Sequence, residues 1–313
     1  MAITIKAFKN YKIHTFTSPE ETGLDNTHII ETHNKLIIID AQFLLPHAKE
    51  VREYVNQLNK SIECLIISHS HPDHWFGSEY FSDVKIYALK EVKEEIEQIG
   101  DLIINNYQFM NGNAPLVPTK KIVPSHILEE GRFVVDELEM VVTKVLETEG
   151  SVISMIEIPE DGILIAQDLV YSNCHIFMAQ GESERVNWIK TLEELKNKNY
   201  KVIFGGHGEP ASEKVFDEVI AYVEYAGECL VKLTNDNIKN YMNKTVHMRS
   251  PMGCVSDKKC NICMGDDIIK YDIKSVGLWV TSLSGTLTNA NMKARHDSTI
   301  KLHRFSPDNI ILK

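Results

Sequence analysis

Apolar residues in the first 233 positions of the chain follow two alternating patterns. Short runs rich in Ile, Val and Leu predict buried strands, at residues 26–31, 35–40, 64–67, 84–88, 140–145, 152–158, 163–166 and 202–204. Longer segments carry apolar residues every three or four positions, which is typical of an amphipathic helix; these are 47–58, 90–99, 185–195 and 212–233. The alternation predicts a layered α/β protein.

Segment 101–123 interrupts this pattern. It contains several Asn residues, Gly112 and prolines at positions 115 and 118. Such a composition favours a loop, or a short helix followed by a loop. Insertions of this kind often carry function, so Tyr107 and Phe109 are candidates for contact with a substrate, with packing onto the core as the alternative.

The chain changes character beyond residue 240. Short β-like runs at 268–271, 276–282, 286–287 and 299–305 are separated by Gly, Ser and Asn, which predicts hairpins. From Lys244 onward the chain has 11 Lys and Arg against six Asp, a net charge of +5, so the remainder carries −16. We therefore expect a main domain at residues 1–240 and a small β-rich C-terminal appendage at residues 241–313, serving dimerisation, cleft closure or partner binding.

Composition limits the class of protein. With 313 residues and 43% hydrophobic content, the chain can bury a substantial core. A net charge of −11 argues against a general nucleic-acid binder, because phosphate backbones require a basic surface. No apolar run approaches the length of a membrane span, and no leader pattern is recognised at the N-terminus. We expect a cytoplasmic protein with reduced cysteines and with neither a nucleic-acid nor a membrane partner.

Metal-ligand residues are concentrated directly after the apolar run 64–67. The motif from Ser68 to Gly77 reads Ser-His-Ser-His-Pro-Asp-His-Trp-Phe-Gly, and its candidate ligands are His69, His71, Asp73 and His74. Imidazoles and carboxylates are good ligands for zinc or iron(II). Alternation places His69 and His71 on one side, while Asp73 and His74 can turn toward a second ion. A strand that ends in this cluster predicts a metal site.

The motif His-x-His-x-Asp-His resembles that of the metallo-β-lactamase fold superfamily, and the resemblance extends over about residues 20–230. It implies a four-layer αββα sandwich. It also implies that Asp40 ends the second strand of the family pattern, that Asp168 bridges two ions, and that His207 in Gly-Gly-His-Gly is the last histidine ligand.

One ligand departs from the family pattern. The family supplies a further histidine from a loop before the bridging aspartate, but no histidine lies between His126 and His175. Spacing from Asp168 selects Glu149 as its replacement, whereas alignment of Gly-Ser selects Glu147. A glutamate ligand favours iron, manganese or zinc in an oxygen-rich site. The alternative is that this loop binds no metal and the first site is weak or empty.

Further candidates come from two other regions. Substrate-lining candidates near the ligands, besides the insertion residues, are Trp75, Tyr171, His175 and Phe177, with a hydrogen-bonded structural role as the alternative for His175. In the last segment Cys254, Cys260 and Cys263 could hold a structural zinc, with His247 or a later histidine as fourth ligand. Only one Cys-x2-Cys pair is present, so three thiols without a metal are the alternative.

The resemblance implies a hydrolase with two divalent metal ions, in which a metal-activated hydroxide attacks a small ester, lactone, thioester or amide. The first ion would be held by His69, His71 and Glu149 and the second by Asp73, His74 and His207, with Asp168 between them and Asp73 orienting the nucleophile. The alternatives are an iron-dependent oxidoreductase of diiron or sulfur dioxygenase type, and a ligand or metal sensor without turnover. We expect a small-molecule substrate, and a homodimer remains an open expectation.

Overall fold

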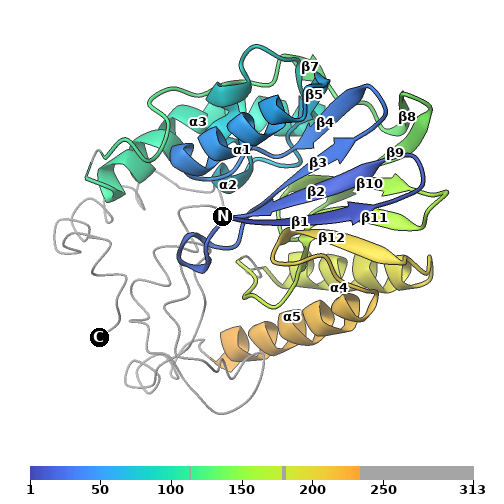
Figure 1. The fold of residues 1–313 in the computed structure, drawn as a ribbon. Coiled ribbons are helices and arrows are strands. Elements are labelled where there is room, and N and C mark those ends of the chain that lie inside the picture. Colours follow the sequence, from blue (N-terminus) through green and yellow to red (C-terminus); the bar gives the residue numbers. More distant parts are fainter. Residues whose placement is uncertain (113, 178–180, 233–313) are drawn as a thin grey trace.

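The computed structural model describes residues 1–112, 114–177 and 181–232. Two β-sheets pack against each other, and helices cover the outer face of each (Figure 1). The predicted four-layer αββα sandwich is therefore confirmed. The predicted domain boundary at residue 240 and the β-rich appendage lie outside the described residues.

The first sheet has seven strands in sequential order, β1 to β7. Neighbours from β1 to β4 are antiparallel, and neighbours from β4 to β7 are parallel. The strands are β1 (Ala2–Ala7), β2 (Lys12–Thr17), β3 (Asn26–Glu31), β4 (Lys35–Ile39), β5 (Ser61–Ile66), β6 (Ile86–Ala88) and β7 (His126–Ile127).

The second sheet has five strands in the order β12, β11, β10, β9, β8. Only β11 and β12 pair in parallel, since helix α4 connects them. The strands are β8 (Gly131–Val135), β9 (Leu138–Leu146), β10 (Val152–Ile158), β11 (Ile163–Tyr171) and β12 (Val202–His207).

Helices form the two outer layers (Figure 1). They are α1 (Leu45–Gln57), α2 (Pro72–Trp75), α3 (Lys90–Met110), α4 (Glu182–Lys196) and α5 (Lys214–Lys232), with short 3-10 turns at Glu20–Thr22 and Phe76–Phe81. Helices α1 and α3 cover the first sheet, and α4 and α5 cover the second. No helix in the described ranges combines the length and apolar character needed to cross a membrane.

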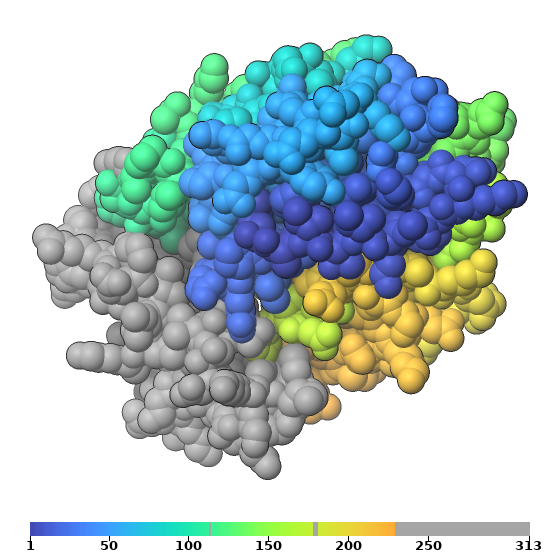
Figure 2. All heavy atoms as spheres, in the orientation of Figure 1, coloured from blue at the N-terminus to red at the C-terminus, as the bar shows by residue number. Residues whose placement is uncertain are grey.

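Each space between two layers holds its own hydrophobic core. Strand β4 shows why, because Leu36 and Ile38 face the helices while Ile37 and Ile39 face the second sheet. Complete burial of each such side chain stabilises the fold by about 1.5–3 kcal/mol. Figure 2 shows the N-terminal strands, in dark blue, between the helices of the first half and the yellow C-terminal half.

Helix α3 corrects the prediction for segment 101–123. The helix continues to Met110, so residues 101–110 are helical. Only the remainder of the segment is a loop. Its buried side continues through Ile96, Gly100, Ile104 and Tyr107, which is a helical spacing. A Cβ atom at Gly100 would lie 3.3 Å from the Trp75 ring, so the glycine permits close packing. Tertiary packing here outweighs the low helix propensity of Gly and Asn.

Glu31, at the end of β3, is a buried carboxylate with three cationic or imidazole partners. Its oxygens lie 2.8 Å from Lys60 Nζ, 3.0 Å from His14 Nε2 and 3.2 Å from Lys12 Nζ. Burial favours the neutral acid, but the bonds from Lys60, His14 and Lys12 outweigh it and lower the pKa of Glu31 to about 2. The folded state therefore favours ionised Glu31.

We predict that Glu31→Gln lowers the free energy of unfolding by about 1–3 kcal/mol at pH 7. The folded pKa lies below the ordinary value of 4.5, so ionised Glu31 contributes fully above that value. The contribution is lost as the pH falls toward the folded pKa. Urea unfolding of metal-free protein at pH 7 and at acidic pH measures both effects.

The matched control is Glu63→Gln, which removes a more exposed pair with Lys35 at 3.1 Å. Exposed pairs contribute about 0–1 kcal/mol, so this variant should unfold close to wild type. An equal deficit of Glu31→Gln at both pH values would contradict the prediction.

Candidate metal centre

The seven predicted ligands reach one place from four parts of the fold. The loop after β5 carries His69 and His71 and continues into α2, which carries Asp73 and His74. The turn between β9 and β10 carries Glu149. Strand β11 contributes Asp168, and β12 ends at His207. The centre therefore lies where strands of both sheets end.

These side chains form two groups that share Asp168. The first contains His69, His71, Glu149 and Asp168, and the second contains Asp73, His74, Asp168 and His207. Within each group the candidate ligand atoms lie within 4.8 Å of one another. Asp168 Oδ1 lies 3.3 Å from His74 Nε2, and Asp168 Oδ2 lies 3.3 Å from His207 Nε2 and 3.7 Å from His69 Nε2.

Many of the polar atoms that converge here lack hydrogen bonds. Six buried atoms of the two groups have no hydrogen-bond partner: Nε2 of His69, His74 and His207, Nδ1 of His71, Oε2 of Glu149 and Oδ1 of Asp168. An unsatisfied buried polar atom costs about 1–3 kcal/mol, so six in one place require an explanation. Divalent cations use these donors, and the residues present therefore fit a metal centre.

Asp40, directly after β4, orients His74 directly and His69 through Ser68. Its Oδ2 accepts a hydrogen bond from His74 Nδ1 at 2.7 Å and another from Ser68 Oγ at 2.7 Å. Gln167 Nε2 also donates to this oxygen. Ser68 Oγ in turn lies 2.9 Å from His69 Nδ1. In a neutral imidazole, these bonds place the proton on Nδ1 and direct the Nε2 lone pair into the centre.

Strand β3 holds the end of β12, which carries His207. Asn26 Nδ2 donates to the carbonyl oxygens of Gly205 at 2.9 Å and Gly208 at 2.7 Å. His28 Nε2 donates to Gly205 O at 3.0 Å. His207 Nδ1 donates to Gly23 O at 2.8 Å, which again turns Nε2 toward the centre. These contacts join the two sheets at the site.

Close packing leaves no space for a side chain at position 206. A Cβ atom there would overlap Asp168 Oδ1. Gly150, beside Glu149, is less crowded, since a Cβ would lie 3.6 Å from His69 Cδ2 and 3.9 Å from His71 Cε1. Of these two glycines, only Gly206 is required for the approach of β12 to the shared aspartate.

Burial and opposite charges shift the pKa values in the cluster. For Asp168, burial favours the neutral acid, but His74 and His207 hold its pKa well below the ordinary value. For His71, burial favours the neutral ring, but Glu149 at 3.1 Å raises its pKa to about 9. Carboxylates and imidazoles thus stabilise each other's charged forms.

Solvent reaches the centre at two side chains. Asp73 is 15% exposed and His71 is 10% exposed, whereas the other five ligand side chains are almost completely buried. Phe177 lies beside the opening, and its ring stands perpendicular to that of His71 with 6.0 Å between centroids. Phe177 is therefore the predicted lining residue of segment 171–180 that lies beside the opening.

The structure also separates the two glutamate candidates. Glu149 lies within the first group, 3.1 Å from His71 and 3.6 Å from His69. Glu147 is exposed at the start of the turn, and its Oε2 accepts a long contact of 3.4 Å from Asn187 Nδ2. Glu147 therefore does not face the centre, and its φ of 51° marks the start of the turn.

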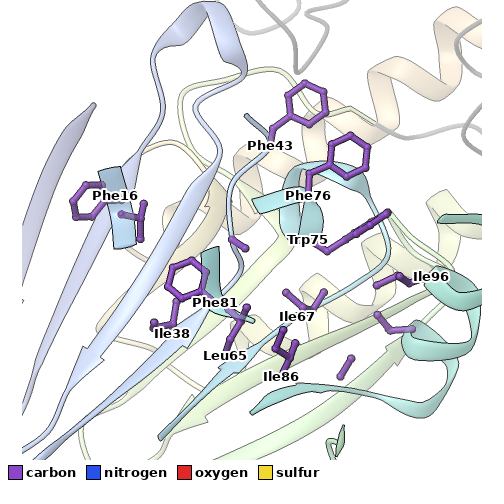
Figure 3. Close-up of a cluster of buried hydrophobic side chains, with 14 of the residues drawn as sticks. Phe16, Ile38, Phe43, Leu65, Ile67, Trp75, Phe76, Phe81, Ile86 and Ile96 are labelled. Atoms are coloured by element: carbon purple, nitrogen blue, oxygen red, sulfur yellow. The ribbon is translucent and has the colours of Figure 1, made fainter. Parts of the chain in front are cut away.

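Most of the predicted substrate-lining residues do not reach the opening. Trp75 is buried among apolar side chains (Figure 3), and its indole donates to Ser70 O at 2.9 Å. Tyr107 packs against Phe43 and Phe76, and Phe109 is 70% exposed on the outer side of α3. The core determines where the Trp75 and Tyr107 rings lie, and for Tyr107 this is the packing alternative that the sequence left open. Helical geometry places Phe109 on the outside.

The other two lining candidates lie deeper in the fold. His175 is buried, with Nδ1 2.7 Å from Tyr222 Oη on α5. Tyr171 is also buried and contacts the centre through its hydroxyl, 2.6 Å from Asp168 Oδ2. The three cysteines predicted to hold a structural zinc, Cys254, Cys260 and Cys263, and the suggested fourth ligand His247 lie outside the described residues.

Comparison with known proteins agrees with this arrangement. Residues 22–207 match the metallo-beta-lactamase superfamily, a stretch that contains all seven candidate ligands. The fold resembles a metallo-beta-lactamase from Pontibacter korlensis, with a TM-score of 0.54 and 13% identity over 71% of this chain and 99% of that one. It also resembles the mono-zinc form of FIM-1 from Pseudomonas aeruginosa, with a TM-score of 0.53 and 18% identity over 72% and 96% of the two chains.

A sequence relative covers less of the chain. The uncharacterized protein YobT of Bacillus subtilis (strain 168) is 28% identical over 103 residues, which are 33% of this chain. The match spans 42% of that relative's length.

We predict that Glu149→Ala removes one metal ion per chain, because it deletes the only non-bridging carboxylate of the first group. Glu147→Ala should leave the metal content unchanged, because Glu147 faces away from the centre. Elemental analysis of protein purified without added metal compares the two variants with wild type. Equal metal content in all three proteins would exclude Glu149 as a ligand.

We further predict that Gly206→Ala displaces Asp168, weakening metal binding at least about tenfold and lowering stability by about 1–3 kcal/mol. Gly150→Ala is the control, since its new methyl group meets only ordinary contact distances. Chelator competition and urea unfolding measure the two effects. Wild-type metal affinity in Gly206→Ala would contradict the assignment of Asp168 as the shared ligand.

Proposed function

This chain belongs to the metallo-β-lactamase superfamily, and on that premise we propose that it is a metal-dependent hydrolase of a small ester, lactone, thioester or amide. The observation that carries the proposal is the convergence of six buried, unsatisfied ligand atoms in two groups that share one aspartate. Such a donor set fits two divalent ions at the end of the sandwich.

In this proposal the first ion is held by His69, His71 and Glu149, and the second by Asp73, His74 and His207, with Asp168 serving both. Zinc, iron and manganese all accept this mixture of imidazole and carboxylate. When bound, such ions acidify a water molecule and polarise the bond under attack.

Asp73 is the residue best placed to act on the attacking water. Its side chain is the most exposed of the seven. Asp73 Oδ2 lies 3.2 Å from His207 Nε2 and 3.5 Å from His74 Nε2, which fixes one edge of the carboxylate. A carboxylate held in this way can orient a water molecule and accept its proton. Asp73 is therefore assigned as the general base.

The substrate approaches past His71 and Asp73, since these are the exposed members of the cluster. Phe177 offers an apolar surface beside His71. The apolar part of a small substrate would lie against this ring, with its polar bond directed toward Asp73. The geometry fits a compact ester, lactone, thioester or amide.

A specific observation favours a second candidate function. The non-bridging ligands of the first group are two histidines and one carboxylate, His69, His71 and Glu149. This ligand set is typical of non-haem iron(II) enzymes that activate oxygen. An iron-dependent oxidoreductase is therefore the alternative to the hydrolase.

We predict that zinc-loaded or iron-loaded protein hydrolyses at least one member of a panel of small esters, lactones, thioesters and amides. Asp73→Asn should lower kcat/KM about 100-fold or more, because it removes the proposed base. Asp83→Asn, at a remote carboxylate paired with Arg52 at 2.8 Å, should retain activity. Initial rates and the metal content of each protein are measured together.

The same panel distinguishes the two functions. A fully metal-loaded protein that hydrolyses none of the compounds would contradict the hydrolase proposal. Substrate-dependent oxygen uptake by the iron-loaded protein under those conditions would support the oxidoreductase instead.

A further inference from the structure

Tyr171 ends strand β11, three residues after Asp168. In a regular strand, residues three positions apart point to opposite faces. Here the pairing of β11 with β12 is irregular between Gln167 and Tyr171, and Gln167 has a φ of 48°. The irregular backbone brings the side chains of Tyr171 and Asp168 to the same place.

Tyr171 touches ligands of both groups. Its hydroxyl donates to Asp168 Oδ2 at 2.6 Å and lies 3.4 Å from Glu149 Oε1. Its ring stacks on the His207 ring with 4.7 Å between centroids and an angle of 3° between planes. The side chain is buried. Its hydroxyl therefore occupies a defined position between two carboxylates.

These two carboxylates need such a donor. The ligand oxygens of Glu149 and Asp168 lie within 4.8 Å of each other, and both residues approach His69 Nε2, at 3.6 and 3.7 Å. A histidine in place of Glu149 would be uncharged, whereas the glutamate adds a third carboxylate to the centre. Like charges at this separation in a buried place repel strongly. In the part of the chain that the structure describes, the Tyr171 hydroxyl is the hydrogen-bond donor that reaches both residues.

We propose that Tyr171 is a positioning residue whose hydroxyl offsets the repulsion between the carboxylates of Glu149 and Asp168. The hydroxyl holds Asp168 by a short, charge-assisted hydrogen bond. The hydroxyl hydrogen, which carries a partial positive charge, is directed between the two carboxylates. Asp168 is thereby held in an orientation that serves both groups. This inference rests on the proposed function in one respect, since it takes the cluster to be a metal centre.

The test begins with Tyr171→Phe, which removes the hydroxyl and keeps the ring that stacks on His207. Zinc affinity is measured by competition with a chromophoric chelator, so the result does not depend on catalysis. We expect zinc affinity to fall about tenfold, because contacts behind metal ligands typically alter affinity by 10–100-fold. Tyr11→Phe is the matched control, as it removes another phenol–carboxylate bond, 3.0 Å to Asp161, far from the centre along the sheet.

The decisive comparison repeats the Tyr171→Phe substitution in protein that lacks the Glu149 carboxylate. In Glu149→His the third carboxylate is gone, so adding Tyr171→Phe should lower zinc affinity less than about threefold. An equal loss in both backgrounds would mean that Tyr171 orients Asp168 alone, and it would overturn the proposal. Unchanged affinity of Tyr171→Phe in the wild-type background would overturn it as well.

The remaining outcomes distinguish a failure of the Tyr171 proposal from a failure of the proposed function. If Glu149→His does not fold, Glu149→Gln provides the uncharged background with nearly the same shape. If wild-type protein binds no zinc, iron or manganese, the proposed function itself fails before any variant is compared. If wild-type protein binds metal and hydrolyses substrate while the two backgrounds respond equally to the loss of the hydroxyl, only the role of Tyr171 is wrong.

Discussion

Three carboxylates and four histidines lie together in a region that is almost closed to water. The contacts of the surrounding residues follow from the cost of burying these charges. Isolated charges in such a place would be strongly unfavourable. The cost is reduced because each carboxylate faces at least one imidazole, as the contacts of Asp168 with His74 and His207 show. Six ligand atoms still lack hydrogen bonds. The centre is therefore arranged for cations rather than for its own internal hydrogen bonding.

The sandwich places these groups by ending its strands at one edge. Parallel pairing of β4 with β5 brings Asp40 next to Ser68, and parallel pairing of β11 with β12 brings Asp168 next to the loop of His207. Asp40 then orients His74 directly and His69 through Ser68. The rigid strands thus provide the precision that a metal centre requires, since ligands on mobile loops would be ordered only at an entropic cost.

Glu149 gives the centre its individual chemistry. It places a carboxylate where the family resemblance implies a histidine, and it lies opposite Tyr171. Asp73 and His71 are the two candidate ligands whose side chains are partly exposed, and the proposed substrate would approach past them. The proposed hydrolytic role and its iron-dependent alternative would use the same opening, and they would differ in which metal the two histidines and Glu149 retain.

The amino-acid sequence predicted the layered fold, most of the strands between residues 26 and 207, and the motif that begins at His69. It could do so because buried strands and amphipathic helices leave periodic apolar patterns, and because ligands close in the chain are also close in space. The short or polar strands β1, β2, β7 and β8 carry little of that signal. Tertiary structure alone placed Glu149 rather than Glu147 in the cluster, buried Trp75 and Tyr107 in the core, and brought Tyr171 to Asp168. Those positions depend on a turn, a helix extended by packing and an irregular strand. The turn is closed by local hydrogen bonds, whereas the helix extension and the strand irregularity arise from contacts between residues far apart in the chain.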